Sequence, residues 1–263
     1  MKAITQSIKI MTTTLAGCML LMSLPAYSQH ADVDSTFHIY LLIGQSNMSG
    51  RGKPDSESKV INPQIHMLDS SNHWVPATDP VHFDKSIAGV GPAISFAKNM
   101  LDDNKNIKIG LVPCAWGGSP ISVWEPGAVY MGKAHPYDDA MARTKVAMQQ
   151  GVLKGVLWHQ GESDNNSTRA SLYLNKLKVL INRLRGDLQM PDLPFVAGEI
   201  GYFNKVDIIN KVIDSLPGAV PNTAVVSAKG LVDKGDRLHF NTASARELGK
   251  RYSEAMKKLQ ENK

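Results

Sequence analysis

The chain has 263 residues and 43% hydrophobic content, enough for one large domain with a single core. Its formal net charge is +5. Because it carries no block of Lys or Arg and no basic stretch interleaved with aromatic residues, the sequence gives no support for nucleic-acid binding.

Residues 1–28 have the pattern of a secretory signal peptide. Lys2 and Lys9 precede an apolar segment at 11–24, and small residues stand at the minus-three and minus-one positions of a cut after Ser28. The apolar segment is shorter than the roughly 20 residues that a membrane span needs. We therefore expect an exported protein, periplasmic or secreted, with no integral membrane span and one domain at 29–263.

A lipoprotein is the alternative form of export. The residues before and including Cys18 read LAGC, which resembles a bacterial lipobox, but most of the apolar segment follows Cys18. Cleavage after residue 28 would leave 27 basic against 24 acidic residues and a single cysteine, Cys114. Cys114 then has no partner for an internal disulfide, and its position after an apolar run predicts a buried small side chain.

Past the signal, short apolar runs alternate with longer segments of helical periodicity, the pattern of a parallel sheet covered by helices. Strands are predicted at 38–43, 107–112, 152–158, 195–199 and 223–227. Helices are predicted at 92–101, 137–149, 168–185, 205–215 and 242–260. The segment 50–91 is loop-like, and is either a substrate-facing insertion or a surface excursion. The prediction is a three-layer α/β/α sandwich with a five-stranded, mainly parallel sheet of flavodoxin-like type.

Ser46 is the first candidate for a catalytic residue. It follows the first predicted strand by a few residues, within the sequence LLIGQSNMSG, and Asn47 stands beside it. The carboxyl ends of strands in open α/β sheets face a crevice where ligands bind. A serine hydroxyl at that place becomes a nucleophile when a base takes its proton.

A base for Ser46 is found near the other end of the chain. Asp236 stands three residues before His239 in a turn-rich stretch ahead of the last predicted helix. In a turn this spacing can place both side chains on one side, so that the carboxylate orients the imidazole and stabilises its charged form. A helix cap beside an ordinary histidine is the alternative for such a pair taken alone.

Donors for an oxyanion are expected after two other strands. Gly117 and Gly118 follow the second predicted strand and offer backbone amides that no side chain covers. Gln160 follows the third and offers a side-chain amide. The backbone amide of Ser46 would be a third donor, and a plain turn is the alternative for the two glycines.

The motifs GQSNM, AWGG, WHQGESD and DRLHF, in this order, resemble the SGNH-hydrolase superfamily. Within it they are most similar to the carbohydrate esterases that include sialic-acid-specific acetylesterases and family six acetylxylan esterases. The resemblance implies Ser46 as nucleophile, His239 as general base and acid, and Asp236 as orienting carboxylate. It further implies Gly118, or else Gly117, and Gln160 as oxyanion donors, with no cofactor and no metal.

Other polar and aromatic residues of these motifs have open roles. Glu162 would orient His239 in place of Asp236, bind a sugar hydroxyl, or hold its own loop. Arg51 would be structural or would meet an acidic sugar. Trp116 and Trp124 would either form a surface on which a pyranose ring stacks or simply pack in the core.

We expect, from these motifs, an exported serine esterase that removes O-acetyl groups from carbohydrate, xylan or a similar glycan. A sialic-acid-specific 9-O-acetylesterase and a non-catalytic carbohydrate-binding protein on the same scaffold are the alternatives. A metal-dependent hydrolase is disfavoured because the eight histidines are scattered and no HExxH motif occurs. An α/β-hydrolase is disfavoured because Ser46 lacks the second glycine of the GxSxG motif.

Overall fold

The computed structural model describes residues 33–102 and 104–261. The predicted signal peptide and Cys18 lie outside these residues, so export stays a prediction. Within the described part of the chain, no helix has both the length and the apolar content to cross a membrane.

A seven-stranded sheet in the order β3-β2-β4-β1-β5-β6-β7 forms the middle of the described chain. All neighbouring strands are parallel except β2 and β3. The α/β fold class with a mainly parallel sheet is therefore confirmed. The strands are β1 (Asp34–Gly44), β2 (Ile65–Leu68), β3 (Trp74–Pro76), β4 (Lys108–Pro113), β5 (Gly151–His159), β6 (Phe195–Gly198) and β7 (Thr223–Val226).

The five predicted strands are all present, but the count of five is wrong for the described residues because β2 and β3 lie in the segment expected to be loop. These two strands form an antiparallel hairpin at the edge of the sheet, with β2 hydrogen-bonded to β4. They have only four and three residues, too few for an alternating apolar pattern to stand out. Trp74 in β3 packs edge-on against Phe37 in β1, with ring centroids 4.8 Å apart.

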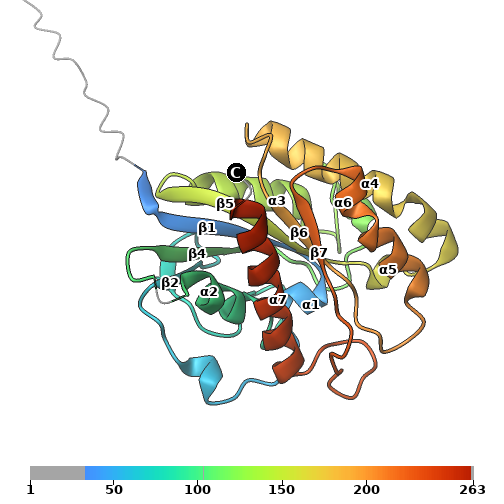
Figure 1. Cartoon of the computed structure of the whole chain (residues 1–263), viewed down its shortest axis with the longest axis horizontal. Coiled ribbons are helices and arrows are strands. Elements are labelled where there is room, and N and C mark those ends of the chain that lie inside the picture. The colour runs from blue at the N-terminus through green and yellow to red at the C-terminus, as the bar shows by residue number, and fades with distance from the viewer. Residues whose placement is uncertain (1–32, 103, 262–263) are drawn as a thin grey trace, which may run out of the picture. The chain divides into compact units, whose positions relative to one another are not determined.

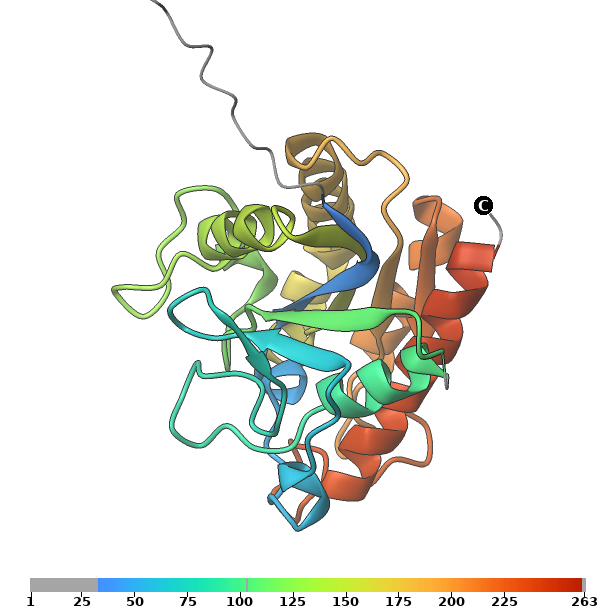
Figure 2. The same ribbon diagram turned by 90° about the vertical axis from the view of Figure 1, so that its left-hand side faces the viewer.

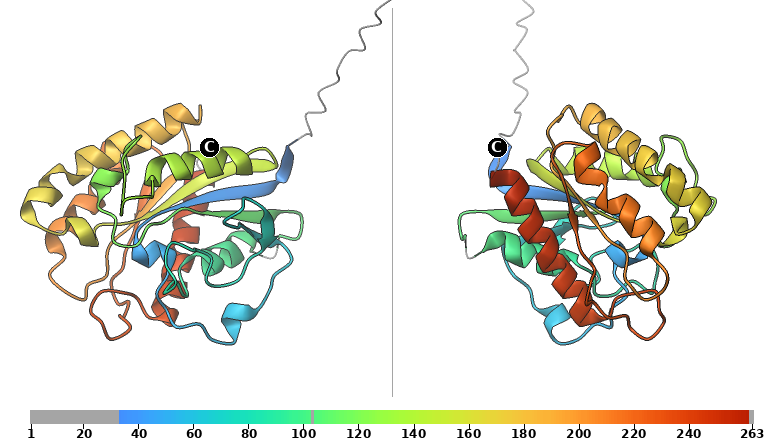
Figure 3. Two further views of the ribbon diagram at one scale, coloured as in Figure 1. Left: turned by 180° about the vertical axis from the view of Figure 1, so that it is seen from behind. Right: turned by 45° about the vertical axis from the view of Figure 1, so that its right-hand side comes forward.

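Helices cover both faces of the sheet (Figure 1 and Figure 2). Two of them, α2 and α7, lie side by side on one face, and α4 with its neighbours lies on the other (Figure 3). The helices are α1 (Ser46–Ser49), α2 (Ala93–Leu101), α3 (Pro136–Ala147), α4 (Ser167–Asp187), α5 (Asp207–Asp214), α6 (Leu216–Ala219) and α7 (Thr242–Glu261). Three single turns of 3-10 helix complete them, η1 (Glu57–Lys59), η2 (Ile121–Val123) and η3 (Glu162–Asp164).

The central strand β1 is apolar at every position from Ile39 to Ile43, where it is buried on both sides. Ile39, Leu41 and Ile43 enter the core beneath α3 and α4, whereas Tyr40 and Leu42 enter the core beneath α2 and α7. A strand sandwiched between two helical layers has no solvent-facing side, so it reads as a continuous apolar run. The strand then ends in the polar residues that form the site.

The contact between α7 and α2 allows no side chain at Gly249. A Cβ atom there would lie 2.2 Å from the Pro92 carbonyl oxygen. We expect Gly249→Ala to lower the free energy of unfolding by about 1–3 kcal/mol, measured by urea denaturation, because the helices would have to move apart. Gly186→Ala in α4 is the matched control, since nothing lies within 4 Å of its added atom; it should leave stability unchanged or raise it by up to about 1 kcal/mol. Equal stability of both variants would contradict this packing.

Candidate active site

The turn after β1 places Ser46 at the carboxyl edge of the sheet. Gly44 has φ of +128°, and a Cβ there would lie 2.2 Å from the carbonyl oxygen of His159 at the end of β5. The Gln45 amide donates to the same oxygen at 2.8 Å. The ends of β1 and β5 are therefore in direct backbone contact, and α1 begins with Ser46 at this junction.

Ser46, His239 and Asp236 form one hydrogen-bonded chain. The Ser46 Oγ lies 3.0 Å from His239 Nε2, and His239 Nδ1 lies 2.7 Å from Asp236 Oδ2. The other carboxylate oxygen of Asp236 accepts from the backbone amides of Leu238, at 3.0 Å, and His239, at 2.8 Å. The structure thus brings Ser46 to a pair of residues at least 190 positions later in the sequence, in the geometry of a nucleophile, a base and an orienting carboxylate.

The local contacts of Asp236 favour its charged form. Partial burial opposes ionisation, but the hydrogen bonds from the amide and ring of His239 and from the Leu238 amide are stronger together, so the pKa of Asp236 is held below its usual value. Asp236 is thus a carboxylate at neutral pH. Its negative charge stabilises a positive charge on His239, which forms when His239 takes a proton.

The geometry distinguishes Gly118 from Gly117 as the oxyanion donor. The amide of Gly117 donates to Asp84 Oδ2 at 2.9 Å, so it is already engaged. The amides of Gly118 and Ser46 have no hydrogen-bond partner among the described residues, and Gly118 is exposed. These two backbone amides are therefore free to donate to a substrate oxygen.

The structure contradicts the prediction that Gln160 donates directly to an oxyanion. Gln160 is completely buried, and its side-chain nitrogen lies 2.7 Å from Asp164 Oδ2, 3.1 Å from Gln45 Oε1 and 3.1 Å from the Ser119 carbonyl oxygen. An amide nitrogen carries two hydrogens, so the protein's own acceptors use both. Gln160 instead joins the segments that follow β1, β4 and β5.

Asn47 connects the serine turn to the histidine loop. Its Oδ1 accepts from the Phe240 amide at 3.1 Å, and its Nδ2 donates to the Leu238 carbonyl at 3.1 Å. These two backbone groups flank His239 on either side. The same Nδ2 donates to Glu162 Oε1 at 2.5 Å. Asn47 therefore holds the peptide around His239 in place directly beside Ser46.

Glu162 makes no hydrogen bond to His239, so the structure places Asp236, not Glu162, as its carboxylate partner. Burial raises the pKa of Glu162 to about 7, although the hydrogen bond from Asn47 opposes this shift. Burial also lowers the pKa of the neighbouring His159 to about 3. The His159 Nε2 lies 3.9 Å from Glu162 Oε1. Two buried groups in contact are therefore both pushed toward their neutral forms.

Arg51 and Trp124 are internal, which favours the structural alternative for Arg51 and the packing alternative for Trp124 over contact with sugar. Arg51 is 6% exposed, and its Nη2 lies 2.9 Å from Asp84 Oδ2 in a buried ion pair. Trp124 is 1% exposed and packs edge-on against Trp158. Trp116, in contrast, is half-buried and lines a cavity beside the site.

Asp84, which no sequence motif predicted, connects the turn after β1 to the glycines after β4. It accepts hydrogen bonds from the Ser49 hydroxyl and the Gly117 amide as well as from Arg51. Nothing in its sequence context marks it, since it stands alone in the segment expected to be loop. No group of three or more His, Cys, Asp or Glu side chains within the described chain is arranged to hold a metal ion.

Comparison with known proteins places this geometry in a family. The family "Carbohydrate esterase, sialic acid-specific acetylesterase" matches residues 36–258. A probable carbohydrate esterase of Arabidopsis thaliana is 36% identical over 234 residues, which are 80% of this chain and 86% of that protein. An X-ray structure of an Arabidopsis thaliana protein aligns with a TM-score of 0.76 at 34% identity, over 84% of this chain and 98% of that one.

A carbohydrate acetylesterase from Xanthomonas citri has a TM-score of 0.68 at 20% identity, over 86% of this chain and 57% of that one, which supports the fold alone. The fold and the comparisons together define an SGNH-type ester hydrolase. The chain belongs to the sialic acid-specific acetylesterase family of carbohydrate esterases. It is a carbohydrate O-acetylesterase, a carboxylic ester hydrolase, as its motifs predicted.

Removing the side-chain amide of Asn47 should loosen His239 relative to Ser46. We expect Asn47→Ala to lower kcat on an acetyl ester by roughly 10–100-fold with a smaller change in KM, because small misplacements of catalytic groups cost about that much. Steady-state kinetics measure the effect. Asn99→Ala is the matched control, since the Asn99 side chain bonds only to the Ser95 carbonyl oxygen of its own helix. Activity of Asn47→Ala within twofold of the unmutated protein would contradict the positioning role.

The buried carboxyl of Glu162 predicts a specific pH dependence of stability. Its pKa is about 7 in the folded chain against 4.5 without the protein environment. Between these values the folded state binds more protons, so this group's contribution to the free energy of unfolding is full below about pH 4.5 and is lost as the pH rises through about 7.

Glu162→Gln retains the Oε1 acceptor for Asn47 and removes the ionisation. We expect its stability relative to the unmutated protein to rise by on the order of 1 kcal/mol or more between about pH 5 and pH 8. Urea denaturation at several pH values measures this difference. The lowered pKa of His159 changes stability with pH in the opposite sense, but it does so in both proteins and therefore cancels in the difference. A difference that does not change with pH would show that Glu162 is ionised in the folded chain.

Proposed function

We propose that this protein is an exported serine esterase that removes O-acetyl groups from a glycan through an acetyl-enzyme. The hydrogen-bonded chain from Ser46 through His239 to Asp236, beside two unpartnered backbone amides, carries the proposal. The sequence before residue 29, which has a signal-peptide pattern, supports export.

In the first half of the reaction, His239 Nε2 takes the proton of Ser46 as Oγ attacks the acetyl carbonyl carbon. The carbonyl oxygen becomes negatively charged and accepts hydrogen bonds from the amides of Gly118 and Ser46. Asp236 stabilises the positive charge on His239. His239 then gives its proton to the departing sugar oxygen, which leaves the acetyl group on Ser46.

In the second half, water replaces the sugar. His239 takes a proton from this water, whose oxygen attacks the acetyl carbon, and the same two amides hold the oxyanion. Collapse of the intermediate returns the proton to Ser46 Oγ and releases acetate. No step requires a group beyond these side chains and amides.

The natural ester is proposed to lie on acetylated xylan or a similar glycan, with a 9-O-acetylated sialic acid as the alternative. Acetate release from acetylated xylan, mannan and pectin and from sialylated mucin distinguishes them, with the Ser46→Ala protein as blank. Preference for the mucin would favour the sialic-acid alternative. Absence of acetate from every substrate, with sugar binding retained, would indicate a carbohydrate-binding protein that does not catalyse hydrolysis.

Ser46→Ala and His239→Ala should each lose at least about a thousandfold in kcat on an acetyl ester while remaining folded, since deletion of a triad member costs at least this much. Asp236→Asn should lose less, though still substantially. Ser171→Ala and His73→Ala are matched controls at exposed positions. Near-normal activity of Ser46→Ala would falsify the mechanism, and a greater loss from Glu162→Gln than from Asp236→Asn would transfer the orienting role to Glu162.

A further inference from the structure

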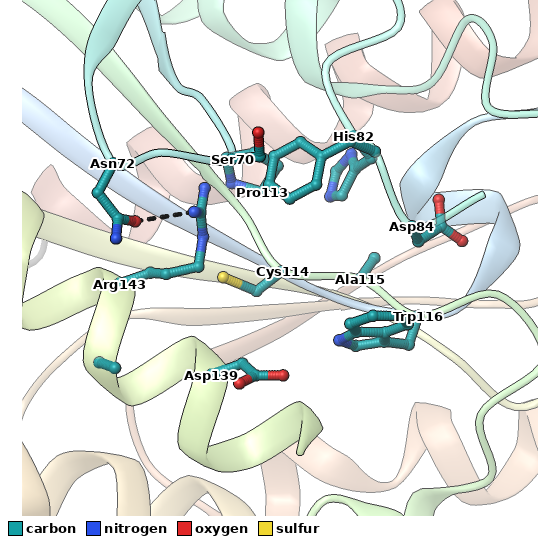
Figure 4. A pocket seen from close by; sticks show the side chains of 12 residues that line it. Ser70, Asn72, His82, Asp84, Pro113, Cys114, Ala115, Trp116, Asp139 and Arg143 are labelled. Carbon is teal, nitrogen blue, oxygen red and sulfur yellow. Dashed lines mark hydrogen bonds between the residues drawn. The ribbon is translucent and has the colours of Figure 1, made fainter. Parts of the chain in front are cut away.

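A cavity of about 320 Å³ lies at the carboxyl end of β4, beside the proposed site. It is bounded by the turn between β2 and β3, the segment 82–84, the segment 113–116 and the first half of α3 (Figure 4). Its volume is at the lower end of the range for small-molecule sites, about 300–1,000 Å³.

The cavity is lined by residues next to the proposed oxyanion donors in the chain. Trp116 lines it, and the amide of Trp116 donates to the Gly44 carbonyl at 2.9 Å, at the end of the strand that leads to Ser46. Gly117 and Gly118 continue directly from Trp116. Asp84 lines the cavity as well and accepts from the Gly117 amide. A ligand in the cavity would therefore be adjacent to an ester bound at Gly118.

Two aromatic side chains line the cavity. Trp116 is half-buried, and Phe83 is 49% exposed with the guanidinium of Arg143 stacked 4.9 Å from its ring centroid. Sites for small organic ligands combine such aromatic surface with a few placed polar groups. An aromatic face also gives a sugar ring a surface on which its C–H groups can pack.

Asp139 and Arg143 lie one helical turn apart on α3 and both line the cavity. The Nη atoms of Arg143 donate to the carbonyls of Leu68 and Asp69 and to the Asn72 side chain, and no carboxylate among the described residues lies within ion-pair distance of it. One oxygen of Asp139 accepts from the His135 amide at 3.0 Å. Asp139 thus offers the cavity an acceptor and Arg143 a donor, because the two side chains do not form an ion pair with each other.

His82 is the third polar group that lines the cavity. It is 3% exposed, and its polar neighbour is the backbone of Leu42 in β1. Burial lowers its pKa to about 4, so its ring is neutral at neutral pH and offers one donor and one acceptor.

We propose that this cavity is a subsite for an uncharged sugar ring next to the acetylated sugar. Sugar hydroxyls both donate and accept, which matches the second carboxylate oxygen of Asp139 and the remaining Nη2 hydrogen of Arg143. Asp84 is paired with Arg51. Since the opposite charges of Asp139 and Arg143 also sum to zero, the lining offers no net positive charge to a carboxylated sugar. The inference rests on the proposed function, which supplies the acetyl ester, and adds the recognition of a second sugar.

The test compares an acetylated xylo-oligosaccharide with 4-nitrophenyl acetate, an ester without a sugar. Phe83→Ala and Asp139→Asn should lower kcat/KM on the oligosaccharide, relative to kcat/KM on nitrophenyl acetate, by at least about tenfold, mainly through KM. Ile87→Ala is the matched control, because Ile87 is an exposed apolar residue of the same loop that does not line the cavity. Ile87→Ala should change the ratio of the two kcat/KM values by no more than about twofold. That change is smaller than the loss of one hydrogen bond to a charged group would cause.

Binding gives a second measurement that does not depend on turnover. Titration calorimetry of the full-length Ser46→Ala protein with unacetylated xylohexaose should show binding that Phe83→Ala, added to it, weakens at least about tenfold. An unchanged substrate ratio together with unchanged binding would overturn the subsite while leaving the esterase function intact. Absence of acetate release from both esters by the unmutated protein would instead refute the proposed function.

Acetylated galacturonan, whose sugars carry carboxylates, tests the preference for an uncharged sugar. The unmutated protein should prefer the neutral oligosaccharide, and Asp139→Asn should narrow that preference. A preference for galacturonan would overturn the assignment of an uncharged sugar.

Discussion

The side-chain amide of Asn47 holds together the parts of the proposed site that the chain order keeps apart. Ser46 starts a four-residue helix after the first strand, whereas His239 lies in an exposed loop before the last helix. The four residues of this helix are buried, whereas the loop is exposed and has little packing of its own. Hydrogen bonds between Asn47 and the peptides on both sides of His239 fix the loop to the serine turn, and Glu162 accepts a further hydrogen bond from the same side-chain amide.

The buried ion pair between Arg51 and Asp84 fixes the glycine turn that carries the proposed oxyanion donor. Arg51 holds Asp84, which accepts a hydrogen bond from the Gly117 amide, while the next amide, of Gly118, has no partner among the described residues. A buried pair of this kind costs desolvation, so its contribution is better understood as orientation than as stability. Because Asp84 also lines the neighbouring cavity, one carboxylate links the reacting centre to the proposed sugar subsite.

The core strands were predictable because two helical layers bury them and make them continuous apolar runs, and the long helices because each buries one face at helical periodicity. The β2–β3 hairpin was not, because its strands are too short to show a pattern and depend on pairing with β4. Residue type and motif position also identified Ser46, Asp236 and His239 as neighbours. Residue type and motif position did not show that the Gln160 side chain bonds within the protein, since a glutamine has the same donor whether its partner is a ligand or another residue.

The same limit applies more strongly to substrate choice. The residues that form the cavity come from the β2–β3 turn, the segment 82–84, the end of β4 and α3, and no two of these segments are joined by a sequence motif. The segment 50–91 contributes two of them, which favours its interpretation as a substrate-facing insertion over a surface excursion. Catalytic chemistry fixes residue types at strand ends, but the shape beside them depends on how separate loops pack. The reaction class can therefore be read from the motifs, whereas the sugar it acts on depends on contacts that only the folded chain brings together.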